Sequence, residues 1–378
     1  MSRVGLNLLF INPKLSGGSV TYAKRLTAAI AFADKETEYY IYIHRGCEVS
    51  DFELGENFIV RVLPFTYSSV YMRYMWEQFV LPLYLIIDEV DLIHSLGYVT
   101  PLLTRKRKIV SILDINFRGH GANMKLTKRL LLGFMVRLSA HFSKRIITIS
   151  HFSKNQITEH THVKPNKIKV IYLSGSKDTL DQGELITPNV RQKYNLPDSY
   201  IIAFSSPSPH KNIVNLLLAL KLLINEQPKL TLVLVGHQSS SNELLEIIRK
   251  ENLIRNVIFT GFVPDEEVNP LIAGARVFVF PSKYEGFGIP ILDAQKCMVP
   301  IASSNAGSLP EVGGASVNYF EPEFPDDIAR GIKMCFEQCQ FSKSRIEEGL
   351  ANRASFSWNK TALETLELYD SILKEITV

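Results

Sequence analysis

The sequence predicts an α/β protein of two domains, each built on a parallel sheet with helices on both faces. Three observations lead to this prediction. The chain has 378 residues, which is long for one ordinary hydrophobic core. Short apolar stretches alternate with amphipathic helical patterns, as they do in doubly wound sheets. A polar stretch, SGSKDTLDQGELITPN (174–189), interrupts this alternation and is interpreted as a linker.

The first half contains seven apolar stretches of strand length. Two long amphipathic helices are predicted between them, at 19–33 and 126–142, where apolar residues recur at the helical period. The predicted strands are 4–11, 38–43, 58–63, 90–94, 108–113, 145–150 and 168–173.

The same pattern starts again after the linker. Ligands of such sheets bind beyond the carboxyl ends of the strands, so we expect the ligand-binding residues to follow the strands directly. The predicted strands are 200–204, 230–236, 256–261, 276–282 and 299–303, with helices at 212–224, 242–251 and 324–338.

Composition and charge limit the classes of function. The net charge is +4, which is compatible with an anionic ligand or membrane surface but too weak to indicate nucleic acid. The four cysteines, Cys47, Cys297, Cys335 and Cys339, lack the spacing of a metal site, and we expect reduced thiols in a cytoplasmic protein. No signal peptide or membrane-spanning stretch of roughly 20 apolar residues is recognised.

The stretch KYEGFGIPILDAQ (283–295) follows a predicted strand and carries acids at both ends. Glu285 lies in a glycine-containing loop, and Asp293 lies in the helix that follows. Glycines permit close approach of a ligand, and free amides at a helix N-terminus suit a phosphate or a hydroxyl. The acids could line a cleft and bind a polyhydroxyl ligand. Alternatively, the segment is a tight turn and a buried helix with surface acids, and spacing alone does not decide between the two.

The longer segment FVFPSKYEGFGIPILDAQ…VPIASSNAGSLPEVGGASVNYFEP (278–322) resembles the retaining glycosyltransferases of glycosyltransferase family 4. Their hallmark is a pair of acids at this spacing. The resemblance implies the GT-B fold: two Rossmann-like domains facing a central cleft, with a last helix crossing back to the first domain. We therefore expect domains at 1–178 and 179–357, and a returning helix at 358–378.

The resemblance also implies roles for residues of the second domain. Glu285 would contact hydroxyls of the donor sugar, and Asp293 would bind the ribose of the nucleotide. Lys211, in FSSPSPHKN (204–212), would bind the donor diphosphate and offset the charge of the leaving group. Lys211 and Glu285 are thus the candidate catalytic residues, and no metal is expected. The other implied donor positions are Ser205, Ser206, Gly236, Val263, Gly286, Phe287, Gly288 and Ile289.

In the first domain, Gly17 and Gly18 precede a helix, which is a generic anion-binding turn or simply a tight turn. The resemblance places this loop near the donor phosphates and the acceptor. It places Asp114 near the donor sugar. The family often has histidine directly before that aspartate, whereas this chain has Leu113. His120 could substitute for it, or could be an ordinary solvated histidine.

Three further departures from the family pattern concern the donor side. Asp293 is one methylene shorter than the usual glutamate, Met298 replaces a common glycine, and His210 stands near a usual arginine position. Leu113 motivates an alternative function, a nucleotide-sugar-binding partner subunit without transferase activity. A sugar-nucleotide epimerase or a phosphorylase of the same fold is another alternative.

By analogy, the resemblance implies a hexose donor that is a nucleoside-diphosphate sugar and no cofactor. A UDP-sugar is favoured over a GDP-sugar such as GDP-mannose only by the breadth of the family. The acceptor is expected to be a saccharide or lipid-linked hydroxyl in surface polysaccharide synthesis.

Peripheral contact with an anionic membrane, on its inner face, is a further hypothesis. It rests on basic residues around the helix at 126–142 and on the aromatic residues of 67–79. The alternative is a core-packed helix with a basic rim. The basic residues are Lys125, Lys128, Arg129, Arg137, Lys144 and Arg145.

Overall fold

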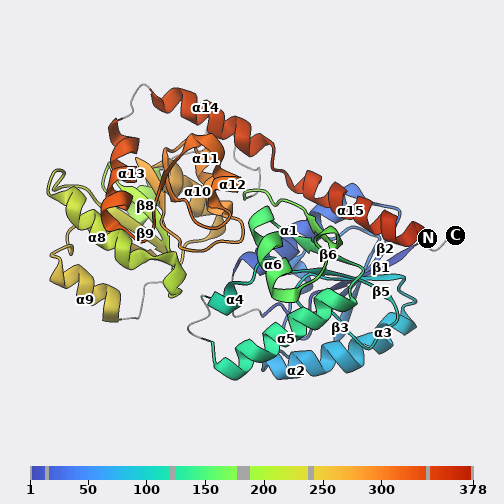
Figure 1. Cartoon of the computed structure of the whole chain (residues 1–378). Coiled ribbons are helices and arrows are strands. Elements are labelled where there is room, and N and C mark those ends of the chain that lie inside the picture. The colour runs from blue at the N-terminus through green and yellow to red at the C-terminus, as the bar shows by residue number, and fades with distance from the viewer. Residues whose placement is uncertain are drawn as a thin grey trace. The chain divides into compact units, whose positions relative to one another are not determined.

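The computed structural model describes residues 2–12, 17–119, 124–176, 188–236, 242–337 and 341–375. The chain divides into two compact units (Figure 1). Unit 1 comprises Met1–Arg118, Met124–Leu173 and Ser357–Val378, and unit 2 comprises Ser174–Phe356 together with Gly119–Asn123.

Unit 1 contains a seven-stranded parallel sheet in the order β3-β2-β1-β4-β5-β6-β7. The strand order reverses between β1 and β4, so the connections that follow these two strands run in opposite directions. The crevice between them is the switch point, where folds of this kind bind ligands. The strands are β1 (Arg3–Asn7), β2 (Glu38–His44), β3 (Phe58–Leu63), β4 (Leu92–Ser95), β5 (Arg107–Ser111), β6 (Arg145–Thr148) and β7 (Ile168–Val170).

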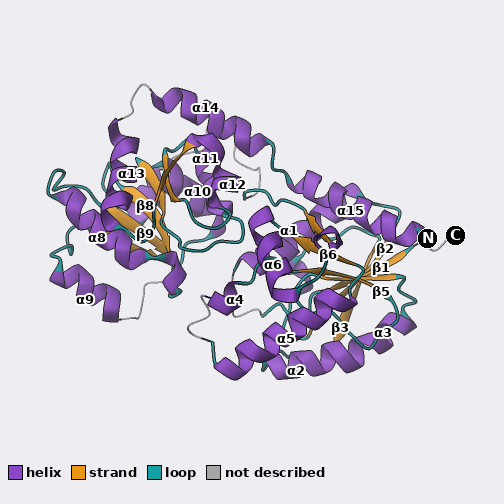
Figure 2. Ribbon diagram, in the orientation of Figure 1, coloured by secondary structure: helices purple, strands orange, loops and turns teal. Residues whose placement is uncertain are grey.

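Helices cover the sheet of unit 1 (Figure 2). The continuous helical segment Val70–Ile87 contains a π-helical turn, η2, that ends two residues before Pro82. Proline lacks an amide hydrogen and cannot donate the regular helical hydrogen bond. The helices are α1 (Gly18–Ala33), η1 (Val49–Asp51), α2 (Val70–Met75), η2 (Trp76–Val80), α3 (Leu81–Ile87), α4 (Asn116–Gly119), α5 (Leu126–Phe142), α6 (His151–Thr161), η3 (Pro165–Lys167) and α15 (Trp358–Lys374).

The last helix, α15, belongs to unit 1 and packs on α1. Its Tyr369 is buried, and its hydroxyl lies 2.6 Å from Nδ1 of His94 on β4. His94 Nε2 lies 2.7 Å from the hydroxyl of Ser111 on β5. Burial lowers the pKa of His94 to about 3, so the imidazole is neutral and one ring nitrogen donates while the other accepts. The C-terminal helix is therefore tied to the sheet through a polar contact inside the core.

Unit 2 contains a six-stranded parallel sheet in the order β10-β9-β8-β11-β12-β13, which reverses between β8 and β11. The strands are β8 (Ile201–Ser205), β9 (Leu232–Gly236), β10 (Val257–Gly261), β11 (Val277–Phe280), β12 (Ile301–Ser304) and β13 (Val317–Phe320). The helices are α7 (Pro188–Lys193), η4 (Pro209–Lys211), α8 (Ile213–Ile224), α9 (Asn242–Lys250), α10 (Asp265–Ala273), α11 (Ile289–Lys296), α12 (Leu309–Gly313), η5 (Gly314–Ser316), α13 (Pro325–Glu337) and α14 (Phe341–Ala354).

Successive residues of the unit 2 strands enter two different cores. Val277 and Val279 pack in one apolar cluster with α8 and α13, whereas Phe278 and Phe280 pack in the other with α10 and α11. This follows from the period of two in a strand. Because both faces are covered by helices, these strands are mostly apolar on both of their faces, and the predicted doubly wound fold is confirmed.

Three differences from the predicted elements have local causes. β1 ends at Asn7 instead of residue 11, because Asn7 Oδ1 accepts from the amide of Leu9 at 3.2 Å and turns the chain. β13 was not predicted, since only four residues form it after a glycine-rich turn. Of the predicted linker, residues 174–176 pack within unit 2, and residues 177–187 lie outside the described residues.

Within the described parts of the chain, no helix combines the length and apolar character needed to cross a membrane. Within the described residues, Cys47, Cys297 and Cys335 form no disulfide, and Cys339 lies outside them.

Candidate functional site

The structure brings Lys211 and Glu285 together at the switch point of unit 2. Lys211 lies in η4, after β8, and Glu285 lies in the loop after the neighbouring strand β11. Lys211 Nζ is 2.6 Å from Glu285 Oε1, with 23% and 16% of the two side chains exposed. The ammonium also lies 5.3 Å from the ring centre of Phe280. A half-buried ion pair thus occupies the edge of the sheet where open α/β folds bind ligands.

The loop that carries Lys211 is fixed by its neighbours. Asn212 has a φ of 59°, a left-handed conformation that asparagine tolerates better than most residues. Its amide donates to the carbonyls of Pro281 at 3.0 Å and Pro322 at 2.7 Å. The amide of Lys283 donates to the carbonyl of His210 at 2.8 Å. The bonds to Pro281 and from Lys283 join the loops after β8 and β11 on both sides of Lys211, and the bond to Pro322 adds the segment after β13.

A serine and a glycine hold the backbone around Glu285. Ser308 Oγ lies 3.0 Å from the carbonyl oxygen of Glu285 and 2.9 Å from that of Phe287. Gly307 has a φ of +66°, and a Cβ added there would lie 2.8 Å from the Glu285 carbonyl oxygen. The loop after β12 therefore needs glycine at position 307 in order to pack against the loop that carries Glu285. Ser308, Gly307 and Asn212 were not predicted as site residues, although Ser308 and Gly307 lie inside the motif segment.

Gly288 directly precedes helix α11 and has a left-handed conformation, with a φ of +105°. A Cβ there would lie 2.7 Å from the Leu309 side chain. Ile289 is the first residue of α11, and no described side chain caps this end of the helix. The amides of a helix N-terminus that lacks a side-chain cap can receive an anion. Gly286 and Phe287 complete the loop between Glu285 and this helix.

Asp293 is held inside unit 2, against the segment that follows β7. Its Oδ1 accepts from the amide of Ser176 at 2.6 Å, and only 6% of the residue is exposed. Burial raises the pKa of Asp293, while the hydrogen bonds from Ser176 oppose this shift. A Cβ at Gly175 would lie 2.8 Å from Oδ1, so the chain passes very close to the carboxyl group. The contacts described for Asp293 thus involve this segment and not Lys211 or Glu285.

The remaining donor-side positions lie at strand ends. Ser205 ends β8, and its buried hydroxyl has no hydrogen-bond partner within the described residues. Gly236 ends β9 with a φ of +111°, and a Cβ there would lie 2.6 Å from the carbonyl oxygen of Ser205. Ser206 Oγ accepts from the amide of Ser208 at 3.2 Å and orders the turn before Lys211. Val263 is buried in the core, which leaves only its backbone for a ligand.

The first-domain candidates lie in unit 1. Gly17 precedes α1 and Gly18 is its first residue. Asp114 Oδ1 accepts from the amide of Asn116 at 3.1 Å and from the hydroxyl of Tyr98 at 3.2 Å, at the start of α4. Leu113, where a histidine was expected, is buried in the core. His120 lies outside the described residues.

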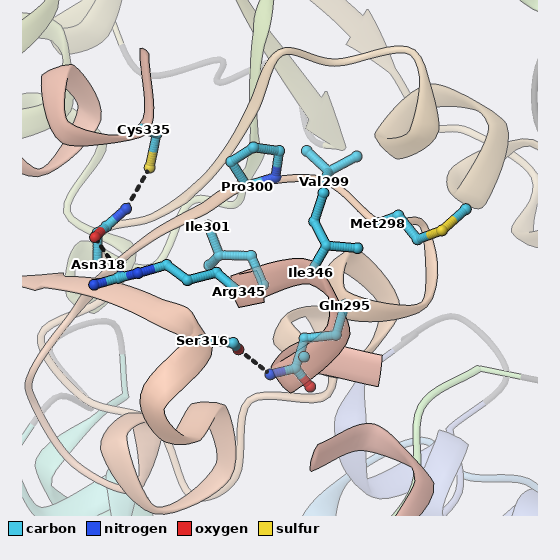
Figure 3. Close-up of a pocket in the computed structure, with 11 residues that line it drawn as sticks. Gln295, Met298, Val299, Pro300, Ile301, Ser316, Asn318, Cys335, Arg345 and Ile346 are labelled. Atoms are coloured by element: carbon cyan, nitrogen blue, oxygen red, sulfur yellow. Dashed lines mark hydrogen bonds between the residues drawn. The ribbon is translucent and has the colours of Figure 1, made fainter. Parts of the chain in front are cut away.

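A separate small cavity lies in unit 2 among α11, β12, β13, α13 and α14 (Figure 3). Gln295 Nε2 donates to Ser316 Oγ at 2.8 Å, and Asn318 lies between Cys335 and Arg345. The cavity measures about 30 Å³, which is room for water and far too little for a sugar nucleotide. It contains none of the predicted site residues.

Over the described residues, no group of three or more histidine, cysteine, aspartate or glutamate side chains could hold a metal ion.

Comparison with known families gives two matches that follow the two halves of the chain. Residues 16–173 match the model described as Glycosyltransferase Family 4. Residues 187–350 match the model described as Glycosyl transferases group 1.

Sequence relatives include proteins named as mannosyltransferases. The chain is 33% identical to the O-antigen chain mannosyltransferase B of Escherichia coli over 230 residues, which is 60% of each protein. It is 30% identical to the serotype-specific mannosyltransferase WbdA of Escherichia coli over 282 residues, covering 72% of this chain but 32% of the relative. The chain thus matches less than two thirds of the length of either relative. It is 24% identical to the uncharacterized glycosyltransferase MJ1607 of Methanocaldococcus jannaschii over 94% of this chain and 95% of that one.

Solved structures resemble the whole chain. Sucrose-phosphate synthase from Thermosynechococcus elongatus aligns with a TM-score of 0.78 at 17% identity, over 99% of this chain and 100% of that chain. Anabaena Alr3699/HepE, solved in complex with UDP and glucose, aligns with a TM-score of 0.73 at 20% identity, over 98% and 100%. At these identities the likeness concerns the fold. The chain belongs to the family 4 and group 1 glycosyltransferases and has their GT-B fold of two parallel α/β domains.

Proposed function

We propose that the protein transfers a hexosyl group from a nucleoside-diphosphate sugar to a hydroxyl of a saccharide or lipid-linked acceptor during surface polysaccharide synthesis. The observation that carries this proposal is the Lys211–Glu285 pair at the switch point of unit 2. A cation and a carboxylate, next to the N-terminus of α11, provide what a diphosphate and a sugar require.

Each member of the pair has a role. Lys211 binds the donor diphosphate and offsets the negative charge that develops on it as the sugar leaves. Glu285 accepts hydrogen bonds from the sugar hydroxyls and is not the attacking group. In the structure each neutralises the other at 2.6 Å, so donor binding exchanges this contact for contacts with the diphosphate and the sugar.

In the proposed reaction the acceptor oxygen attacks the anomeric carbon on the face that the diphosphate leaves. The bond from that carbon to the acceptor forms as the bond to the diphosphate oxygen breaks. The acceptor proton passes to the departing phosphate oxygen, so the configuration is retained without a covalent enzyme intermediate. Because Lys211 supplies the positive charge, we expect turnover to persist when divalent cations are chelated.

We propose mannose as the transferred sugar, which makes GDP-mannose the first donor to test. The names of the sequence relatives support this choice, since several are mannosyltransferases. The UDP complexes of the structural neighbour, at 20% identity, carry less weight for the sugar. A UDP-sugar, which family breadth alone favours, is therefore the contrasting donor.

The test is incubation with GDP-mannose, UDP-glucose and UDP-galactose, with and without short mannoside acceptors. Released nucleoside diphosphate and the anomeric configuration of the product are measured, the latter by NMR. We expect acceptor-dependent release with one donor and retention in the product. Inversion would refute the mechanism, and release with a UDP-sugar alone would refute the donor.

A second function is favoured by one observation. Leu113, at the usual histidine position, is buried, and its side chain offers a ligand no polar group. A nucleotide-sugar-binding subunit would bind a donor in calorimetry yet release no diphosphate with any acceptor. The same incubations therefore separate the two functions.

A further inference from the structure

The helical segment Val70–Ile87 of unit 1 carries its charged residues inward and its apolar residues outward. Arg73 and Glu77 are buried and form an ion pair at 3.1 Å. Glu77 Oε1 also accepts from Asn7 Nδ2, at the end of β1, at 2.5 Å. Polar contacts therefore fasten this segment to the sheet. This reverses the usual orientation of an amphipathic surface helix.

The outer side of the same segment is mostly apolar and carries no charge. Residues 70–87 are all described, and none of the exposed side chains among them is charged; all are aliphatic, methionine or aromatic, and Tyr71 adds one hydroxyl. Met75, Phe79 and Leu83 each expose 56% of their surface, and Ile87 exposes 73%. Such a continuous row, without one exposed charge, is rare on a helix that faces only water.

Helix α5 contributes a second apolar row. Leu126, Leu130 and Phe134 are exposed and follow each other at intervals of four residues, so they lie on one face of the helix. The exposed residues Arg137 and His141 continue this face toward the C-terminal end of α5.

The two rows lie on either side of the loop that contains Thr100. Gln78 on η2 donates to the carbonyl of Thr100 at 3.1 Å, and the amide of Thr100 donates to Ser139 Oγ on α5 at 3.1 Å. Leu103, just after this loop, is also exposed. Figure 1 shows α2 and α5 on the same side of unit 1. We call the exposed apolar side chains of residues 70–87 and of α5 the apolar surface.

A basic pocket opens at the C-terminal end of α5. Its volume is about 390 Å³, and no carboxylate lines it. Lys144 is already paired with Glu375 at 2.6 Å. Burial, together with repulsion from Arg145, lowers the pKa of Lys167. An anion in this pocket would relieve the repulsion among its cations. The lining residues are His141, Lys144, Arg145, His162, Val163, Lys164, Asn166 and Lys167.

We propose that the apolar surface and the basic pocket together form a docking surface for an anionic lipid bilayer. The apolar side chains would enter the boundary between headgroups and acyl chains, and the pocket would hold lipid phosphates. Two rows of flexible apolar side chains suit a fluid bilayer, which adapts to them. The adjoining cations complement its negative charge. This inference does not depend on the proposed transferase activity.

The test is flotation of the protein with phosphatidylcholine vesicles, with and without phosphatidylglycerol, in the absence of any donor. We expect partition onto the phosphatidylglycerol vesicles and a decrease as salt is raised. The mass of the free protein is measured in parallel by light scattering over a range of concentrations.

Two sets of variants locate the surface. Met75→Gln, Phe79→Gln and Leu83→Gln together should lower partition at least about tenfold, because they remove most of the apolar contact of one row. Arg137→Gln with Lys164→Gln should lower partition onto anionic vesicles about fivefold for each charge removed. Because these side chains are exposed, the variants should keep the wild-type melting temperature, and single variants Phe79→Gln and Phe134→Gln serve if the triple variant does not.

Matched controls lie elsewhere on the chain. Phe32, Ile254 and Phe262 are apolar residues that are more exposed than Met75, Phe79 and Leu83, and Arg249 and Lys250 are exposed cations on α9. Their replacement by glutamine should leave partition unchanged. The proposal is overturned if wild type does not partition, if the controls lower partition as much as the test variants, or if the triple variant only abolishes a concentration-dependent dimer. Loss of partition with normal donor turnover would leave the proposed function intact.

Discussion

At the scale of single residues, Lys211 is the most informative test of the site. Lys211→Met removes the charge proposed to offset the leaving diphosphate, so turnover should fall at least about 100-fold. The melting temperature should change little, because the pair with Glu285 is partly exposed. Steady-state kinetics with the preferred donor measures the effect.

Lys283→Met is the matched control. Lys283 lies two residues from Glu285 and pairs with the exposed Glu323 at 2.6 Å. It should keep near wild-type turnover. Equal losses in both variants would mean that Lys211 acts only through general charge at this surface.

Asp293 allows a test by pH. Burial raises its pKa above the ordinary 3.8, so the folded protein binds this proton more tightly than the unfolded chain does. The contribution of Asp293 to stability therefore falls as pH rises from about 4 through the raised pKa. Asp293→Asn keeps an oxygen for the amide of Ser176 but cannot ionise. The free energy of unfolding of wild type, relative to the variant, should decline over that interval in denaturant titrations, and parallel curves would contradict the assigned burial.

The sequence predicted part of this site at residue scale. Lys211 and Glu285 stand in local motifs after strands, and the structure brings them together, although their roles stay predictions. The partner of Asp293 was not predictable, since Ser176 is 117 positions away in a stretch interpreted as linker. Periodicity and motif spacing carry no information about such a contact.

At the scale of elements, the buried contact between α15 and the sheet is testable. Tyr369→Phe leaves His94 Nδ1 without its partner in a dry core, which should cost about 1–3 kcal/mol of unfolding free energy. Tyr71→Phe, at an exposed tyrosine, is the control and should be neutral within error. Chemical denaturation of both variants measures this, and a neutral Tyr369→Phe would show that His94 finds another partner.

Helices and strands were predictable because their hydrophobic periods differ. The direction in which a given helix face points was not predictable. A row of apolar residues indicates one face of a helix but not which way that face points. In the segment Val70–Ile87 the buried Arg73–Glu77 pair decides it, and that pair depends on Asn7 at the end of a distant strand. The π turn before Pro82 likewise needs the tertiary structure to be recognised.

At the scale of the whole molecule, unit 1 is discontinuous and needs the C-terminus. Thr365, Tyr369 and Ile372 of α15 are buried in it, and the Arg107 guanidinium donates to the carbonyl of Ile372. Truncation after Phe356 should therefore expose the core beneath α15 and sharply lower the melting temperature of unit 1. Unit 2 should stay protected in limited proteolysis, and an unchanged first transition would contradict this assignment.

Ser174 and Phe356, the first and last residues of the long segment of unit 2, are joined by a hydrogen bond of 3.0 Å from Ser174 Oγ to the Phe356 carbonyl. Almost all of this unit is thus one uninterrupted insertion whose ends meet. A gene segment encoding residues 174–356 could accordingly be exchanged with that of a relative through two neighbouring junctions. Chimeras of this kind would exchange the proposed donor-binding unit while keeping the rest of the protein unchanged.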